Sequence, residues 1–488
     1  MPLADLDKRA LVLFFMIYLC INSVFLYYLQ FLDSELNTIQ ISYDSIVFDS
    51  VCCSTLLLGG ILATFLIRAH YLFYLSFGCF LLGIAIFEWK APFTDGGFYW
   101  TVELLIGISL GLFKFLYIVA LIDQNDRKYI KFNVAFFLFS DCFCYLIVYT
   151  FTSNKASDEN NTKTYVRRVL AVLGTILVVI GIFVKRFERN SEVIELYGII
   201  KFIRQRKSFY ESEYEMINNV GAVHYKKVII SISKSVIVFL LLIPYGICDS
   251  QQLYAYAYQS NSLRPPHGNR YFTSDFWSNT ITSMIVIMTL LILLSARFLN
   301  EKAFDKLYSK MKAKIILGNI FMIISTLICG ALETFRLSTR WTANNSSVTS
   351  NYKNMTIDKK TYINMSVLCM IPQSILLSFS EILVIPTCIE YVILESEKST
   401  KYFAVALIVS VVNIGGISDF LTVIMEFKNI TPSDFDSNKK ATIRLDYLMY
   451  IISSVSVISL VISILLMVRF KKYFTLDEFN KMEEVNEI

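Results

Sequence analysis

The chain has 488 residues, of which 55% are hydrophobic and 17% charged, and its formal net charge is +5. A soluble domain carries roughly 25% charged residues, and here the charges collect in short blocks between long apolar runs, which excludes a large soluble protein. No Lys/Arg-rich stripe alternates with aromatic residues, so the sequence does not indicate a nucleic-acid partner.

Twelve apolar blocks follow one another along the chain. Each approaches the ~20 residues that a helix needs to cross about 30 Å of hydrocarbon. The first block is too long for the core of a signal peptide, so we expect it to remain as the first span. The sequence therefore predicts an all-α membrane protein with twelve transmembrane helices, at residues 10–32, 46–67, 70–88, 99–122, 131–151, 167–185, 227–249, 277–297, 313–332, 366–394, 402–425 and 446–469.

The longest charged connection, residues 186–226, divides these spans into six and six. Its apolar stretch at 193–203 predicts an interfacial helix. We expect an N-terminal six-helix bundle at 1–185, a cytoplasmic linker at 186–226, a C-terminal bundle at 227–470 and a cytoplasmic tail at 471–488. Two bundles of six resemble the layout of major facilitator transporters, whose substrate site lies midway across the bilayer between the halves.

The orientation follows from the connections between spans. Those that are rich in Lys and Arg lie on one side, which predicts cytoplasmic N- and C-termini. Six N-x-S/T sequons all fall on the opposite side, which indicates a eukaryotic plasma membrane or secretory-pathway membrane and a glycoprotein. The glycosylation candidates are Asn160, Asn344, Asn345, Asn354, Asn364 and Asn429.

Several ionisable residues interrupt the apolar blocks. A charged group near the bilayer centre costs about 2.5–3.5 kcal/mol on insertion scales, so such residues are functional candidates by default. They are Asp49, Glu103, Lys114, Asp141, Asp249, Glu381 and Glu390.

Glu103 and Lys114 belong to the fourth block. A spacing of eleven residues brings them to about 20° of one another around a helix and about 16 Å apart along it. We expect this face to line a polar cavity, with Lys114 at midspan. The alternative is that Lys114 is a structural ion-pair partner between helices.

Glu381 lies deep in the tenth block, and Glu390 follows it by nine residues on the opposite face, about 13 Å closer to the cytoplasm. The two glutamates therefore have different roles. Glu381 is the candidate for a midplane cavity, whereas Glu390 is a cytoplasmic-side gate or a packing contact.

The remaining candidates are harder to assign. Asp249 ends the seventh block with Gln251 and Gln252, where it is either a gate or proton carrier or a solvated helix end. Asp141 either faces the cavity or bonds a neighbouring helix. Asp49 is expected to be solvated near the outer end of the second span.

Catalytic chemistry has little support in the sequence. The ten cysteines all lie in or beside apolar runs, which indicates packing rather than disulfides or metal sites. No nucleophile–base pair, glycine-rich phosphate loop or metal-ligand spacing is present. We therefore expect no enzyme activity, no cofactor and no metal.

Three stretches resemble the proton-dependent oligopeptide transporter family, a branch of the major facilitators. The strongest is Ile371–Glu381, which contains I-P-Q and a Glu eight residues after the Gln, continues to Glu390-Tyr391 and reaches Lys398–Lys401. The family's tenth helix has this pattern at the same spacings.

The other two stretches fall in different spans. Gly107–Lys114 followed by Asp123-Gln124 is similar to the fourth helix of the family. Asp249–Gln259 is similar to the seventh-helix D-Q-Q-x-x-x-W-x-x-Q pattern, with Tyr256 in the Trp place. Asn279, at the start of the eighth span, falls where the family has a substrate-contacting Asn.

The resemblance implies proton-driven import of di- and tripeptides. It assigns Glu381 and Asn279 to the amino terminus of the peptide and Lys114 to its carboxylate side. A zwitterion in a low-dielectric cavity needs opposite charges that meet its two ends, which agrees with this assignment. The implied partners are a peptide-like solute, protons and the lipid bilayer.

The first span departs from the family. The Glu-x-x-Glu-Arg motif that serves proton coupling there is missing, with Phe14-Phe15 over its Glu-Arg and Asn22 at the basic position that meets the peptide carboxylate. Thr64 replaces the Asp of the family's G-x-L-A-D pattern. We expect secondary active transport by alternating access, with the proton coupling that the resemblance implies. Because the first-span motif is missing, the alternatives are an uncoupled facilitator of another small solute and a receptor or scaffold that binds without turnover.

Overall fold

The fold is known from a computed structural model of the chain. It describes two individual residues, 16 and 19, near the N-terminus and then the helices and strands from residue 38 onward. The described residues are 38–90, 96–123, 134, 136–140, 142–143, 146, 168–169, 172, 176, 220–251, 256, 259–260, 263–264, 283–290, 311–340, 363–397, 400–411 and 445–469. Five helices in this part of the chain are long and apolar enough to cross a membrane, at Trp100–Val119, Lys227–Ser250, Ala313–Arg336, Val367–Leu394 and Leu445–Leu465.

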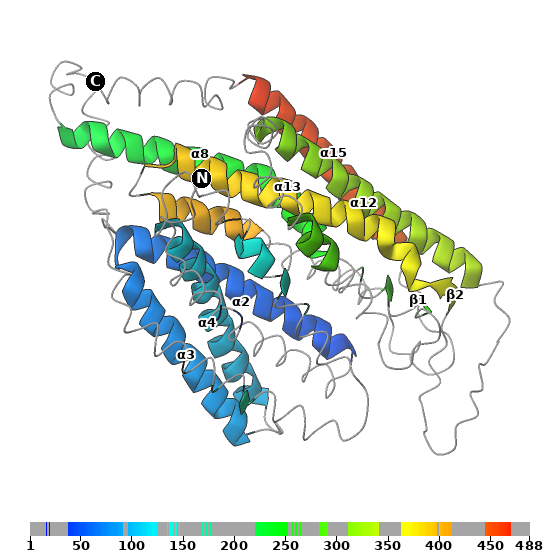
Figure 1. Cartoon of the computed structure of the whole chain (residues 1–488), viewed down its shortest axis with the longest axis horizontal. Coiled ribbons are helices and arrows are strands. Elements are labelled where there is room, and N and C mark those ends of the chain that lie inside the picture. The colour runs from blue at the N-terminus through cyan, green and yellow to red at the C-terminus, as the bar shows by residue number, and fades with distance from the viewer. Residues whose placement is uncertain are drawn as a thin grey trace.

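Three helices from the first half of the chain pack together. They are α2 (Thr38–Phe65), α3 (Ala69–Lys90) and α4 (Gly96–Asp123). Figure 1 shows them side by side at the blue end of the chain, with α4 in contact with both neighbours. Their positions confirm the second, third and fourth apolar blocks as helices.

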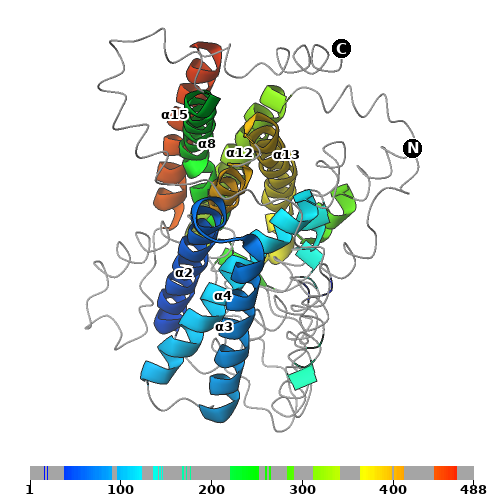
Figure 2. The same cartoon turned by 90° about the vertical axis from the view of Figure 1, so that its left-hand side faces the viewer.

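Four helices from the second half form the other group: α8 (Val220–Ser250), α12 (Met311–Arg340), α13 (Ile371–Glu395) and α15 (Leu445–Arg469). α12 lies between α13 and α15, and α8 contacts all three. Figure 2 shows this group on the other side of the molecule from α2, α3 and α4.

A shorter helix, Lys401–Val411, joins the two groups. A Cβ atom added at Gly60 on α2 would lie only 2.3 Å from Ala406 Cβ. One added at Gly246 on α8 would lie only 2.2 Å from the Val411 carbonyl oxygen. At these two glycines the backbones of α2 and α8 therefore approach this helix closely, as small residues allow at membrane helix interfaces.

The contacts give the helices two directions. α2 and α4 run parallel, because Gly107 meets α2 at Phe48 and Gly111 meets it farther along at Cys52 and Thr55. α3 opposes α4, since the Ser76 hydroxyl bonds the Ser109 carbonyl while Gly83 packs against Ile106. α12 likewise opposes both α13 and α15. Such alternation is what a chain that repeatedly crosses a bilayer requires.

Exposed apolar side chains cover the outer helices. α15 presents Ile451, Ile458 and Leu465 at 58%, 61% and 62% exposure. α3 presents Tyr71, Leu75 and Leu82 in the same way, whereas most of α4 is buried. Surfaces of this kind suit hydrocarbon rather than water.

Several helix boundaries differ from the sequence prediction. α2 and α8 begin at Thr38 and Val220, ahead of the predicted starts at 46 and 227. α12 continues to Arg340, beyond the predicted end at 332, because the charged residues that close the apolar block are paired with one another. The tenth span begins as a 3₁₀ turn, η6 (Val367–Met370), after strand β2 (Ile363–Ser366), which pairs in parallel with β1 (Leu263–Arg264). This two-stranded sheet is a minor addition to a fold that is otherwise helical among the described residues, as predicted.

The α2–α4 contact gives a stability prediction. A Cβ on Gly111 would lie 2.1 Å from Thr55 Oγ1 and 2.5 Å from the Cys52 carbonyl oxygen, so Gly111→Ala must push α2 away. We expect it to lower the thermal unfolding temperature of the purified protein by several degrees. Gly78→Ala on α3 is the control, since a Cβ there meets nothing within 4 Å and helix propensity alone favours Ala. Equal behaviour of the two variants would contradict this packing.

Candidate functional site

The predicted polar face of α4 is only partly as expected. Glu103, Gly107, Gly111 and Lys114 lie within about 80° of arc on this helix. The two glycines of this stripe pack against α2, so the face does not line a polar cavity along its whole length. Glu103 is 1% exposed, and Lys114 is half-buried. Of these two charged residues, Lys114 is therefore the more accessible.

A second polar group lies where α8 meets α13. Tyr245 and Asp249 are one helical turn apart on α8, so both side chains are on one face. The Tyr245 hydroxyl interacts electrostatically with Asp249 and Glu381 and lies beside Ser380 of α13. We call these four residues, Tyr245, Asp249, Ser380 and Glu381, the α8–α13 cluster.

The α8–α13 cluster is held in place by close backbone packing. The Ser380 hydroxyl donates a hydrogen bond to the Gly318 carbonyl of α12 at 2.7 Å, and the side chains of Leu383 and Val384 fill the space beside Gly318. On the other side, Gly246 brings α8 against Val411. The two helices that carry the carboxylates are thereby fixed against their neighbours.

Asp249 is buried, at 7% exposure, which excludes the solvated helix end considered from the sequence. Its Oδ1 atom has no hydrogen-bond partner within the described part of the chain. Glu381 on α13 is half-buried, and Glu390, on the same helix, is buried at 4% exposure. The different exposure of the two glutamates supports different roles for them.

A buried hydrogen-bond network adjoins this region. Gln373 Nε2 donates to Gln259 Oε1 at 3.2 Å, and Gln259 Nε2 donates to the Cys329 carbonyl at 3.2 Å. Ser325 Oγ donates to the Gln373 carbonyl at 2.8 Å and also pairs with the Tyr256 hydroxyl at 2.8 Å. The network brings together Gln259 and Gln373, which belong to two separate stretches singled out in the sequence.

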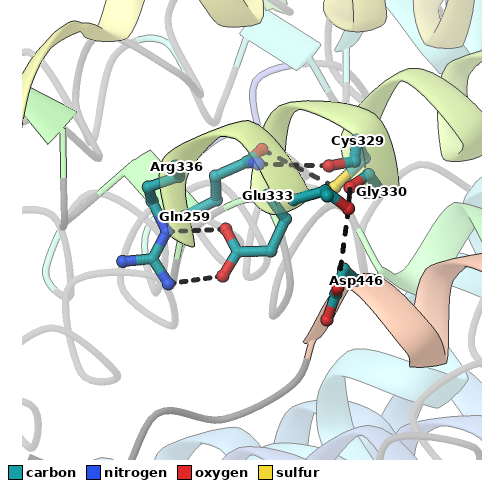
Figure 3. A network of polar contacts seen from close by, with 7 residues as sticks. Gln259, Cys329, Gly330, Glu333, Arg336 and Asp446 are labelled. Carbon is teal, nitrogen blue, oxygen red and sulfur yellow. Dashed lines mark hydrogen bonds and ion pairs between the residues drawn. The ribbon is translucent and has the colours of Figure 1, made fainter. Parts of the chain in front are cut away.

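A buried ion pair on α12 was missed at the level of sequence. Arg336 Nε donates to Glu333 Oε2 at 2.7 Å, a second contact joins Arg336 Nη2 to Glu333 Oε1, and neither side chain exceeds 6% exposure (Figure 3). Thr334, between them, contacts Asp446 and Tyr450 of α15. The predicted end of the span at 332 placed both charges outside the membrane segment, although their i, i+3 spacing is the signal that would have paired them.

Tyr245 was also missed. It lies within the seventh apolar block and carries no charge, so it was not a candidate. Its i, i+4 spacing from Asp249 was the signal that the two side chains are neighbours on one helix face. The predicted site residues Asp141, Gln252 and Asn279 lie outside the described residues, as do the sequons at Asn160, Asn344, Asn345, Asn354 and Asn429. Asn364 lies in β2.

Cysteines are spread over several of the described helices. No group of three or more metal-binding side chains occurs among the residues described. The cysteines in this part of the chain are free thiols, and Cys52, Cys248 and Cys329 are engaged in hydrogen bonds within helix interfaces.

Long apolar helices of alternating direction, lipid-suited outer faces and carboxylates held inside the helical core define a polytopic membrane protein. A family model described as the POT family matches residues 98–429. The chain belongs to the POT family of transporters. No curated protein matches it in sequence.

Solved structures show the same fold. The in meso crystal structure of the POT family transporter PepTSo matches with a TM-score of 0.63 at 15% identity, over 95% of this chain and 98% of that one. An auto-inhibited POT family peptide transporter matches with a TM-score of 0.60 at 13% identity, over 96% of both chains. A POT family transporter in complex with 5-aminolevulinic acid matches with a TM-score of 0.61 at 12% identity, over 96% of this chain and 99% of that one.

Proposed function

We propose that this protein transports small peptides across a membrane by alternating access. The observation that carries the proposal is the contact between two of the stretches that resemble the family, Asp249–Gln259 and Ile371–Glu381. Gln259 bonds Gln373, and the same two segments place Asp249 and Glu381 around Tyr245. Residues that resemble the family in sequence are thus organised into one region of the fold.

The binding roles follow from charge. Glu381 and Asn279 receive the amino terminus of the peptide, and Lys114 receives the carboxylate. Relatives of known structure are described in complex with 5-aminolevulinic acid, alafosfalin and a thioalcohol-conjugated peptide. These ligands support a small solute with a free amine as the substrate of this chain.

The proposed topology has twelve spans in two bundles of six, with residues 186–226 as the cytoplasmic linker and both termini in the cytoplasm. The helix directions support it. α8 runs parallel to the 401–411 helix, since Ser231 meets Thr400 and Gly246 meets Val411. That helix opposes α2, through Cys53 with Ser410 and Phe65 with Phe403, and α2 is parallel to α4. α4 therefore opposes α8, which requires an even number of spans between them, and residues 131–151 and 167–185 supply two. We place the protein in the plasma membrane.

Uptake of a labelled dipeptide into proteoliposomes tests the function. We expect saturable uptake that excess unlabelled dipeptide inhibits. An inward proton gradient separates the two coupling mechanisms. Since the first span holds no charge, we propose downhill transport, in which the gradient leaves the initial rate unchanged. Acceleration by the gradient would show that Asp249, Glu103 or another carboxylate replaces the missing motif.

A transport-inactive receptor is the second candidate. The loss of the first-span charges favours it, because a transporter that has lost its coupling groups retains a binding site. Saturable binding of the dipeptide without any flux into the vesicles would identify this function and exclude transport.

The position of Asn364 gives a prediction about glycosylation. This sequon lies in β2, directly before the tenth span, and the Ser366 hydroxyl accepts a hydrogen bond from the Leu368 amide. Acceptor sequons belong to surface loops. In a eukaryotic host we therefore expect Asn364→Gln to leave the gel mobility unchanged, whereas joint replacement of Asn344, Asn345 and Asn354 removes a glycosidase-sensitive shift. A shift lost in Asn364→Gln alone would contradict this assignment.

A further inference from the structure

The α8–α13 cluster is more acidic than one peptide amino group requires. Tyr245 is 1% exposed, and within the described part of the chain the groups that act on its hydroxyl are Asp249, Ser380, Glu381 and Cys388, none of them cationic. Asp249 Oδ1 is buried without a hydrogen-bond partner among these residues. An ionised carboxylate in such surroundings is strongly disfavoured unless a positive group approaches it.

Within the α8–α13 cluster, the proposed substrate binding leaves one negative charge without a partner. Lys114 and Glu381 together match a neutral zwitterion, one charge for each end. Asp249 then adds a buried negative charge to the same region. A substrate with a net charge of +1 restores the balance, provided that its extra positive group reaches Asp249.

The chemistry of the cluster suits that positive group. A primary ammonium offers three N–H donors, a carboxylate accepts at two oxygens, and a tyrosine hydroxyl accepts at its oxygen while donating its own proton. Tyr245 and Asp249, one turn apart on one face, can therefore share an ammonium. Tyr256, the next tyrosine among the described residues, is already bonded to Ser325 and is not available in the same way.

We propose that Tyr245 and Asp249 form a subsite for a cationic side chain, so that the protein selects small peptides that carry one basic residue. The proposal rests on the function proposed above. It assigns Asp249 to substrate recognition, whereas a carboxylate that only holds a proton would not distinguish cationic from neutral peptides.

The test compares two peptides that differ in one charge. Lys-Ala and its Nε-acetyl-lysine analogue compete against a labelled dipeptide in proteoliposomes that contain the full chain. We expect the wild-type protein to favour Lys-Ala by about tenfold or more, as a lost charged hydrogen bond predicts. D249N should bring the ratio close to one, and Y245F should lower it in part while uptake continues.

Two control variants separate the subsite from general effects of buried polar groups. Asp446→Asn changes another buried aspartate, and Tyr450→Phe removes the hydroxyl that contacts Thr334 at the α12–α15 interface. Both should keep the wild-type ratio. A ratio near one in the wild-type protein, or a wild-type ratio in D249N, would overturn the subsite. Absence of uptake and binding for both peptides would instead overturn the proposed function.

Discussion

Glu381→Gln is expected to reduce dipeptide uptake about 30-fold or more, the loss that follows when one partner of a desolvated charge pair is removed. Glu381 is half-buried on α13, beside the buried groups of the α8–α13 cluster. Glutamine keeps the shape of the side chain but removes the charge and replaces one acceptor oxygen by an NH2 donor. The expected loss therefore reports the interaction with the amino group of the peptide.

Substrate chemistry makes this prediction specific. The wild-type protein should discriminate strongly against a dipeptide whose amino terminus is acetylated, and Glu381→Gln should abolish that discrimination. Glu390→Gln is the matched control on the same helix, since it removes a buried carboxylate from another face and should retain the discrimination. Competition against a labelled dipeptide measures all three proteins. Preserved discrimination in Glu381→Gln would show that the amine binds elsewhere.

Arg336→Ala is expected to destabilise the protein by about 3–5 kcal/mol, because it leaves the Glu333 carboxylate buried at 0% exposure without its partner. The effect should appear as a large drop in the thermal unfolding temperature in detergent. The double variant Glu333→Leu, Arg336→Met removes both charges and keeps the side-chain volume. It should recover most of the lost stability, since replacing a buried pair by apolar residues is often neutral.

The same two variants separate a structural pair from a functional one. If the ion pair only stabilises α12, the double variant transports at close to the wild-type rate. Recovery of stability without recovery of uptake would show that the charges also take part in transport. Equal stability of Arg336→Ala and the wild-type protein would contradict the buried pairing shown in Figure 3.

The sequence predicted the membrane class, the family and the positions of the described helices. Long apolar runs leave little choice of structure in a bilayer, where every backbone polar group must be satisfied within the chain. Span ends were less predictable. Glu333 and Arg336 read as the end of a span because each alone is polar, and only their pairing allows the helix to continue.

The sequence predicted individual residues of the candidate site but not which of them lie together in the fold. Asp249 and Glu381 were singled out as charges in apolar blocks, yet which helices would bring them together depends on contacts such as Gly246 against Val411. Tyr245 carries no charge, and in the sequence only its i, i+4 spacing from Asp249 marks it. The second carboxylate, Glu381, comes beside it only through the fold.

The structure also explains why the glycine run on α4, which resembles the family's fourth helix, consists of glycines. Gly107 and Gly111 are needed because α2 lies against them, with Cys52 donating its thiol to the Gly107 carbonyl at 3.4 Å. The sequence indicated a shared polar face with Glu103 and Lys114. The structure shows that close helix packing occupies the middle of that face.

Exchange across the membrane tests the central claim most directly. Proteoliposomes are loaded with an unlabelled dipeptide, and a trace of the labelled dipeptide is added outside without any ion gradient. An alternating-access transporter predicts a transient accumulation of label above its equilibrium level, which Glu381→Gln reduces sharply. Saturable binding with no transient accumulation in the wild-type protein would contradict transport and would identify a receptor.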